Sequence, residues 1–219
     1  PGYGFLAENP AFARRCAEEG LAFIGPSPEH LELFGDKLRA RELARSRGVP
    51  TLPGTDDSVD TVEEALAFAR STSFPVIVKA AAGGGGRGIR VARDPVELET
   101  VFRVAQREAE ASFGDGTVYL ERFLQRPRHI EVQVLGDAAG QIKHLWERDC
   151  SIQRRHQKLL EECPSPLMTA ELRESLGSLV TRAVSSINYV NAGTAEFLFD
   201  EEGNYYFIEM NTRIQVEHP

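Results

Sequence analysis

The sequence predicts a protein of the α+β or α/β class that contains antiparallel hairpins. Stretches with helix start and stop signals alternate with short β-like runs along the 219 residues. Two segments, 129–149 and 192–211, each carry two alternating apolar runs around a polar turn, which is the pattern of a hairpin. Two such hairpins favour antiparallel sheets over a purely parallel one.

The first fifty residues are mainly helical in pattern. Asn9 followed by Pro10 is typical of an N-cap with proline at the first helical position. A glycine at 48 gives a stop signal to the last of these helices. The expected elements are a helix from 10 to about 20, a buried strand over 21–25, a helical stretch from 28 and a helix over 35–48.

Further along, helices and strands alternate. Thr61 and Glu64 form a capping box at the start of a helix. The segment 150–166 is polar and charged, and we expect it to be irregular. The remaining expected elements are a helix over 62–71, strands over 76–80 and 89–92, a helix from 95 to about 113, a strand over 117–123 and a helix from 169 to about 187.

Composition excludes some classes of function. The net charge of −8 argues against general nucleic-acid binding, because phosphate backbones attract basic surfaces. No apolar run approaches the roughly 18 residues that span a membrane. Three scattered cysteines suit a reducing compartment, so we expect the cytoplasm, or the mitochondrial matrix in a eukaryote. The chain opens on "PGYGF" without methionine and stops at "VEHP", and we interpret it as an excerpt of a longer protein.

The stretch "VIVKAAAGGGGRGIRV" (76–91) places four glycines between two β-like runs. It contains G-x-G-x-x-G, but a dinucleotide-binding fingerprint must lead into a helix, and here a strand follows. A hairpin tip rich in bare N–H groups can fold over phosphates and act as a lid. Lys79 at its base and Arg87 on its tip favour that reading over a simple mobile turn.

The hairpin "TAEFLFDEEGNYYFIEMN" (194–211) predicts a metal site. Folded about 201–204, it pairs Glu196 with Glu209, Leu198 with Phe207 and Asp200 with Tyr205. Asn211 lies two residues beyond Glu209 and therefore shares its face. Opposed carboxylates are destabilising unless a cation lies between them, and carboxylate and amide oxygens suit Mg²⁺. The alternative is a solvent-facing polar stripe.

Two further segments are rich in charge. "NTRIQVEHP" follows the metal hairpin, and it offers Arg213 as an anion clamp and Glu217 as a base. "RDCSIQRRHQK" (148–158) is basic, and it would stabilise anionic reactants if it lies near the hairpin. A solvated loop is the alternative for the second segment.

Together these motifs resemble one family. "GGGGRGIRV", "PRHIEVQVLGD", "ERDCSIQRRHQK", "GTAEFLF" and "FIEMNTRIQVEHP" are similar to the ATP-grasp core of biotin carboxylase, the ATP-dependent part of acetyl-CoA, propionyl-CoA and pyruvate carboxylases. The opening "PGYGFLAENP" and "FIGPSPE" resemble the same family. The resemblance is colinear over essentially the whole chain, and "RRHQK" and "RIQVEHP" are its most specific parts.

The resemblance implies roles for individual residues. Glu196, Glu209 and Asn211 would hold Mg²⁺ or Mn²⁺. Arg213, Gln215 and Val216 would position bicarbonate beside Lys158, and Glu217 would be the base. Residues implied at the ATP site are Lys37, Lys79, Gly85, Gly86, Glu121, Arg122, Phe123, Leu124, His129, Glu131, Gln153, His156 and Leu198, with 121–124 binding adenine through backbone groups.

The resemblance also implies the reaction and the partners. ATP would phosphorylate bicarbonate to carboxyphosphate, and the resulting CO₂ would carboxylate biotin on a carrier protein. The partners would be a biotin carboxyl carrier, a carboxyltransferase and a second copy of the chain, with no nucleic acid or membrane. The implied ATP-grasp domains are the end of a preceding nucleotide-fold domain (1–35), a linking helix (36–50), a lid subdomain (51–123) and a truncated C-terminal subdomain (124–219).

Two alternatives remain open. Another ATP-grasp ligase, such as a carbamoyl-phosphate synthetase, would share the glycine run and the metal hairpin but is not expected to share "RRHQK" with "RIQVEHP". A nucleotide-binding regulatory module would keep Lys79 and the glycines without needing Arg213 or Glu217. The sequence does not indicate which molecule finally receives the carboxyl group.

Overall fold

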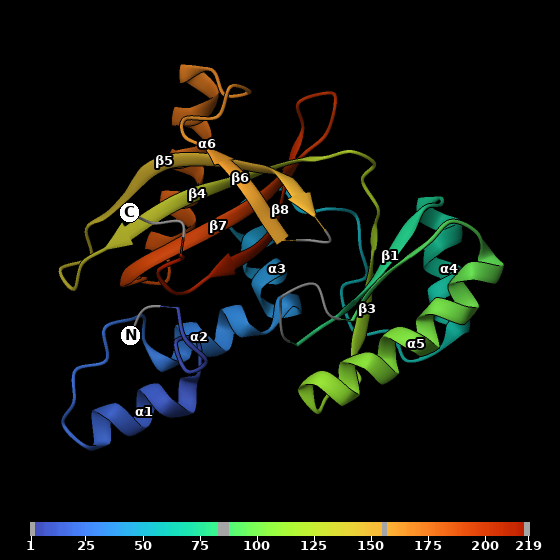
Figure 1. Cartoon of the computed structure of the whole chain (residues 1–219), viewed down its shortest axis with the longest axis horizontal. Coiled ribbons are helices and arrows are strands. Elements are labelled where there is room, and N and C mark those ends of the chain that lie inside the picture. The colour runs from blue at the N-terminus through green and yellow to red at the C-terminus, as the bar shows by residue number, and fades with distance from the viewer. Residues whose placement is uncertain (1–2, 83–87, 155–156, 217–219) are drawn as a thin grey trace. The chain divides into compact units, whose positions relative to one another are not determined.

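The computed structural model describes residues 3–82, 88–154 and 157–216. The chain forms two compact units, each with its own sheet (Figure 1). The larger unit comprises 1–35, 39–51 and 127–219, and the smaller unit comprises 36–38 and 52–126. The prediction of a mixed helix and sheet protein with antiparallel sheets is confirmed. Among the described residues, no helix is long and apolar enough to cross a membrane.

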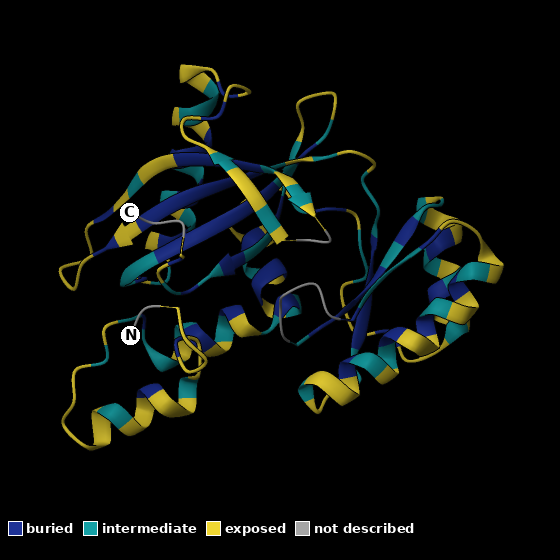
Figure 2. Ribbon diagram, in the orientation of Figure 1, coloured by how far each residue is buried: buried dark blue, intermediate teal, exposed yellow. Residues whose placement is uncertain are grey.

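The larger unit is built on a five-stranded antiparallel sheet in the order β6-β5-β4-β7-β8. Leu176 and Val180 of one helix pack with Ile130 and Phe197 of the sheet in its apolar core. Burial is concentrated in the central strands (Figure 2). Its strands are β4 (Arg128–Gly136), β5 (Ile142–Arg154), β6 (Gln157–Glu162), β7 (Asn191–Phe199) and β8 (Tyr205–Asn211), and its helices are α1 (Pro10–Glu18), α2 (Pro28–Gly35), α6 (Ala170–Ser185) and most of α3 (Lys37–Ser46).

The smaller unit has a three-stranded antiparallel sheet in the order β2-β1-β3, packed against two helices. The expected hairpin around the glycine run is confirmed, because β1 and β2 are antiparallel with Lys79 opposite Ile89. The run 83–87 itself lies outside the described residues. The elements are α4 (Val62–Thr72), β1 (Val76–Ala80), β2 (Ile89–Ala92), α5 (Pro95–Phe113) and β3 (Val118–Arg122).

The helix N-caps that the sequence predicts at Asn9 and Thr61 are confirmed. Asn9 caps α1 by accepting a hydrogen bond from the Phe12 amide at 2.8 Å. Thr61 and Glu64 form the capping box of α4. These short-range contacts satisfy amides that the first helical turn leaves without partners.

Two expected elements are wrong. Residues 21–25 belong to no strand, and Leu21 and Ile24 are 63% and 72% exposed, so this apolar run is not buried as expected. The segment 150–166 is not irregular, because it contains the end of β5 and all of β6. There Ile152 pairs with Leu160 although both side chains are about half exposed, at 53% and 48%. Backbone pairing, rather than an alternating buried face, forms this ladder.

The register of the last hairpin is partly as predicted. Glu196 does pair with Glu209, but Leu198 faces Tyr206 rather than Phe207, and the predicted pairing of Asp200 with Tyr205 is also wrong. The cause is a β-bulge between the two halves of the hairpin, where Ile208 is the extra residue. The turn is correspondingly one residue longer than the sequence indicates, because the last pair is Phe199 with Tyr205. Within this turn Asp200 accepts hydrogen bonds from the amides of Glu202 and Asn204.

A candidate nucleotide and metal site

Charged residues form a row across four strands of the five-stranded sheet. Pairing of β5 with β4 places Arg148 opposite Glu131, and pairing of β4 with β7 places Glu131 opposite Glu196. Pairing of β7 with β8 adds Glu209 opposite Glu196. We call these four residues the charged row. Because side chains alternate along a strand, the row lies on the face opposite Ile130 and Phe197, which belong to the apolar core.

Two carboxylates of the charged row are deeply buried. Glu131 is 0% and Glu196 is 4% exposed, although they are neighbours on adjacent strands. Buried like charges are costly unless cations compensate them. Lys158 of β6 supplies one cation: its Nζ forms an ion pair with Glu131 Oε1 and lies 3.3 Å from Glu196 Oε1.

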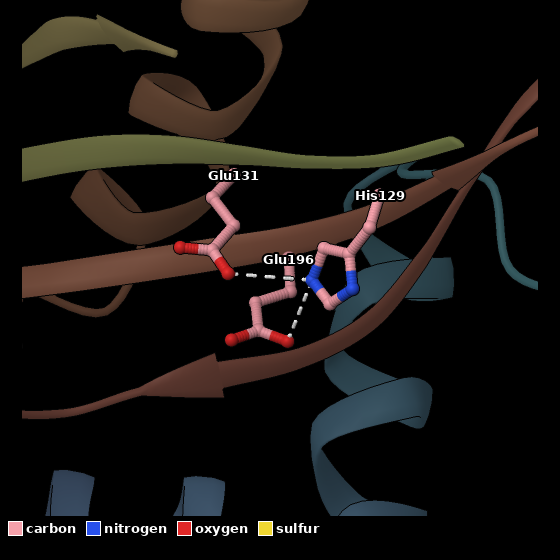
Figure 3. Close-up of side chains that lie close together, drawn as sticks. All are labelled: His129, Glu131 and Glu196. Carbon is pink, nitrogen blue, oxygen red and sulfur yellow. Dashed lines mark ion pairs between the residues drawn. The ribbon is translucent and has the colours of Figure 1, made fainter. Parts of the chain in front are cut away.

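His129 supplies a second contact to the same two carboxylates. Its Nε2 lies 3.0 Å from Glu196 Oε2 and 3.4 Å from Glu131 Oε1 (Figure 3). Burial alone would lower the pKa of His129, but the hydrogen bonds and charges of the two glutamates outweigh it and raise that pKa to about 9. The two glutamates therefore favour the protonated form of His129 when no metal is bound.

The two central carboxylates are not equivalent electrostatically. Burial acts to raise the pKa of Glu131, but His129 and Lys158 more than offset it and hold that pKa well below its usual range. Glu196 has a raised pKa because burial is reinforced by repulsion from Glu209 and Glu131. The pKa of Lys158 is raised, since Glu196 and Glu131 favour its charged form more than burial disfavours it. Another cation beside Glu196 would therefore favour its ionised form.

Arg148 connects the charged row to the segment after β8. Its terminal nitrogens donate to Glu131 Oε2 at 3.1 Å, to Gln133 Oε1 at 3.2 Å and to Gln215 Oε1 at 2.7 Å. Gln133 and Gln215 are themselves buried, at 4% and 3% exposure. The predicted bicarbonate residue Gln215 is thus fixed from the sheet side by a buried guanidinium.

The described residues fit a divalent cation in part. His129, Glu131 and Glu196 each offer a ligand atom, and these atoms lie within 4.8 Å of one another. The carboxylates suit Mg²⁺, which prefers oxygen ligands. Asn211 lies beside Glu196, but its Nδ2 donates to Glu196 Oε1 at 2.6 Å and its Oδ1 accepts from Arg213 at 3.5 Å. A metal bound by Asn211 oxygen and Glu196 would therefore replace both of these contacts.

Two other predicted residues of this unit neighbour His129. Gln153 Nε2 lies 3.0 Å from His129 Nδ1 and donates to Cys150 O at 2.8 Å. Leu198 faces His129 on the neighbouring strand. Val216 is 70% exposed. The predicted residues His156 and Glu217 lie outside the described residues.

The smaller unit carries its own buried ion pair. Lys79 Nζ lies 2.8 Å from Glu121 Oε2 and 5.6 Å from the centre of the Tyr119 ring. Lys37 is also buried, and its amide donates to Ala81 O at 3.1 Å, next to the end of β1. The two predicted phosphate-binding lysines of this unit are therefore both fixed near the start of the glycine run, whose Gly85 and Gly86 lie outside the described residues.

The predicted adenine segment, 121–124, follows from β3 into a loop. The amide of Arg122 donates to Pro53 O at 2.8 Å, and the amide of Phe123 donates to Pro75 O at 3.1 Å. These two amides already have partners within the unit. That 121–124 binds adenine through backbone groups stays a prediction.

Sequence reasoning missed three residues that the structure brings to the site. Gln133 could have been found, since it follows Glu131 with strand spacing in "HIEVQV". Arg148 was visible only as part of a basic segment. Glu8 gave no signal, because its partners Thr212 and Arg213 are more than 200 positions away; its Oε1 accepts from the Thr212 amide at 2.9 Å and its Oε2 from Arg213 Nε at 3.1 Å.

Comparison with known proteins agrees with this architecture. Residues 36–219 match the family described as Carbamoyl-phosphate synthase L chain, ATP binding domain. Residues 1–31 match the Biotin carboxylase, N-terminal domain. These matches are to an ATP-binding domain, and the predicted ATP-grasp fold is confirmed.

The chain belongs to the family of the carbamoyl-phosphate synthase L chain ATP-binding domain. It is 56% identical over 219 residues to the biotin carboxylase of a Nostoc species, and the match covers all of this chain and 49% of that protein. It is 54% identical over 218 residues to the pyruvate carboxylase of Aspergillus niger, of which it covers 18%. The resemblance to biotin carboxylase is confirmed, and the chain spans about half the length of the biotin carboxylases it matches.

Two solved structures are similar over the whole chain. One is the biotin carboxylase domain dimer of the Hydrogenobacter thermophilus 2-oxoglutarate carboxylase in complex with MgADP, ADP and bicarbonate, with 57% identity and a TM-score of 0.97. The other is a biotin carboxylase complex with a β,γ-ATP ligand from Campylobacter jejuni, with 50% identity and a TM-score of 0.97. The chain covers 48% and 49% of these two proteins.

Proposed function

We propose that this chain is the ATP-binding part of a biotin carboxylase, which uses ATP, Mg²⁺ and bicarbonate to carboxylate biotin on a carrier protein. The observation that carries the proposal is the charged row, in which Glu131 and Glu196 are buried side by side and only cations make their burial tolerable. The similarity of this whole chain to about half of a solved structure with bound MgADP and bicarbonate supports the same reaction.

The nucleotide-binding roles that we propose are those that the resemblance implies for each residue. Lys37 and Lys79 neutralise ATP phosphates, with Gly85 and Gly86 covering them as a lid. The backbone of 121–124 binds adenine, and the remaining nucleotide-binding residues are His129, Glu131, Gln153, His156 and Leu198. The domain roles that we propose are a nucleotide-fold remnant (1–35), a linking helix (36–50), a lid (51–123) and a C-terminal ATP-grasp subdomain (124–219).

Glu196, Glu209 and Asn211 would hold the metal. When bound, Mg²⁺ supplies positive charge that offsets the negative charge developing during phosphoryl transfer. The raised pKa of Glu196 marks it as the ligand whose ionised form such a cation would favour. Its present partners, Lys158 and His129, keep the site electrostatically compensated.

The segment after β8 prepares bicarbonate for the reaction. Arg213, Gln215 and Val216 orient the anion, Lys158 adds positive charge, and Glu217 accepts its proton. A bicarbonate oxygen then forms a bond to the γ-phosphorus of ATP while the bond to the β–γ bridging oxygen breaks, which yields ADP and carboxyphosphate. Carboxyphosphate separates into CO₂ and phosphate, the phosphate takes the proton of the biotin ureido nitrogen, and that nitrogen attacks CO₂.

The partners follow from this chemistry. Biotin arrives on a carrier protein or domain, and a carboxyltransferase consumes the carboxybiotin. The similar domain from Hydrogenobacter thermophilus is a dimer, which supports a homodimer for the complete protein. We place the complete protein in a reducing compartment such as the cytoplasm, because Cys16, Cys150 and Cys163 are all free thiols. A relative from Arabidopsis thaliana is described as chloroplastic, so an organelle interior fits equally.

The test is the steady-state rate of bicarbonate-dependent ATP hydrolysis by the complete protein, with and without free biotin. We expect stimulation by biotin, and a loss of two or more orders of magnitude in rate for Glu217→Gln, since the general base is removed. Glu202→Gln, in the exposed turn between β7 and β8, serves as the control. Stimulation by ammonia instead of biotin would identify a carbamoyl-phosphate synthetase-like ligase and contradict the proposal.

A further inference from the structure

Glu8 contacts the segment that follows β8. This residue lies in the turn before α1, and it meets the other end of the chain within the larger unit. Its Oε1 accepts from the Thr212 amide at 2.9 Å and from Thr212 Oγ1 at 3.2 Å. Its Oε2 accepts from Arg213 Nε at 3.1 Å. The Glu8 carboxylate thus fixes the backbone of Thr212 and the guanidinium of Arg213, which are consecutive residues.

The turn that carries Glu8 is itself well fixed. The Ala7 amide donates to Gly4 O at 3.0 Å, and the Asn9 amide donates to Leu6 O at 3.2 Å. Ala7 is buried at 3% exposure, and Asn9 is the N-cap of α1. The backbone on both sides of Glu8 is therefore fixed by hydrogen bonds.

The contacts of Arg213 divide its guanidinium into two edges. Nε faces Glu8, while NH1 donates to Ile214 O at 3.2 Å and NH2 donates to Asn211 Oδ1 at 3.5 Å. An arginine has five N–H groups, so within the described part of the chain these three hydrogen bonds leave one N–H on each terminal nitrogen. Two N–H groups on the terminal nitrogens form the fork that binds a planar oxyanion in a bidentate manner.

We propose that Glu8 is a positioning residue for bicarbonate: by holding Nε of Arg213 and the backbone of Thr212, it turns the terminal N–H groups of Arg213 toward the anion. This inference rests on the proposed function, because it takes Arg213 as the bicarbonate-orienting group. Glu8 itself touches no reacting atom. Its side chain is 42% exposed, so the ion pair contributes little to folding stability, and its effect is on orientation.

The variant Glu8→Gln separates the two contacts. Its amide oxygen can still accept from Thr212, but its NH₂ group cannot accept from Arg213 Nε. Glu32→Gln is a matched control, because the Glu32 side chain is also 42% exposed and also pairs with an arginine, Arg14, in the same unit. Both variants are made in the complete protein and assayed by bicarbonate-dependent ATP hydrolysis in the presence of biotin.

We expect Glu8→Gln to raise the bicarbonate KM about tenfold, with smaller changes in kcat and in the ATP KM and an unchanged Tm. Glu32→Gln should match the wild type in all four quantities. In an Arg213→Ala background, Glu8→Gln should cause no further loss of kcat/KM for bicarbonate, since Glu8 acts through Arg213. That non-additivity is a readout that a purely structural role would not give.

Three results would overturn the inference. Kinetics of Glu8→Gln equal to those of Glu32→Gln would show that the contact does not orient the anion. A further full loss on adding Glu8→Gln to Arg213→Ala would show that Glu8 acts independently of Arg213. If the wild type itself lacks bicarbonate-dependent ATP hydrolysis, the proposed function fails and the inference fails with it. If the wild type is active and Glu8→Gln leaves its kinetics unchanged, only the inference is overturned.

Discussion

The two faces of the five-stranded sheet are both buried but carry opposite chemistry. On β4, Ile130 and Val132 are 0% and 2% exposed and belong to the apolar core, while Glu131 and Gln133 are 0% and 4% exposed on the other face. Because neighbouring residues point to opposite faces, a single strand serves both. Burial alone therefore does not distinguish a residue that stabilises the fold from one that forms the site.

The difference between the faces lies in what compensates the burial. On the apolar face, removal of hydrocarbon from water is favourable by itself. On the charged face, Glu131 and Glu196 need Lys158, His129 and Arg148 to offset the cost of burying charge. Replacing such a charge cluster by apolar residues is often neutral or stabilising. We therefore infer that the charged face exists for binding and chemistry rather than for stability.

The largest effect on stability is expected on the apolar face. Ile130→Ala should lower the free energy of unfolding by about 2–5 kcal/mol, because it removes buried hydrocarbon and leaves a cavity. Leu135→Ala is the matched control on the same strand, with the same number of atoms removed from a side chain that is 49% exposed. It should change stability within about 0.5 kcal/mol. Denaturant unfolding of the complete protein measures both, and equal losses would contradict the assignment of the two faces.

Substitution of Glu131, the neighbour of Ile130 on β4, is expected to lower stability less than Ile130→Ala does but to lower activity more. Glu131→Gln removes one charge from the network of Lys158, His129 and Arg148, and should cost about 1–3 kcal/mol of stability. Bicarbonate-dependent ATP hydrolysis should fall by at least tenfold. Glu202→Gln again provides the control. Activity close to that of the wild type, with lost stability, would mean that Glu131 is only a structural residue.

The smallest effect tests how tightly the apolar face is packed. A Cβ at Gly193 would lie 2.5 Å from Met210 Cε and 2.8 Å from the Tyr189 hydroxyl, so Gly193→Ala should cost about 1 kcal/mol while these side-chain ends shift. Gly35→Ala, where nothing lies within 4 Å, is the control. Thermal unfolding compares the two variants. No difference between them would indicate that this part of the core has room for a methyl group.

Local features of the fold could be predicted from the sequence. The caps at Asn9 and Thr61 and the pairing of Glu196 with Glu209 depend on residues close in sequence. The bulge at Ile208 could not be predicted, because hairpin register was counted from a turn of assumed length. The predicted pairing was therefore right for Glu196 with Glu209, and it was wrong between the bulge and the turn.

The centre of the site could not be predicted from spacing, because it depends on distant strand pairing. Glu131 meets Glu196 only because β4 lies beside β7, and Arg148 meets Gln215 across 67 positions. The resemblance to a family named several of these residues individually, but it gave no geometry. Glu8 shows the limit most clearly, since an exposed glutamate before a helix carries no signal that it contacts Arg213.

The central claim is that the charged face binds the metal and nucleotide while the apolar face holds the fold. The most direct measurement is the Mg²⁺ dependence of bicarbonate-dependent ATP hydrolysis by Glu196→Gln in the complete protein, with Tm recorded alongside. We predict a loss of at least a hundredfold in rate that excess Mg²⁺ restores only in part, with Tm within a few degrees of the wild type. An unchanged Mg²⁺ dependence and rate, or unfolding of the variant, would contradict the account.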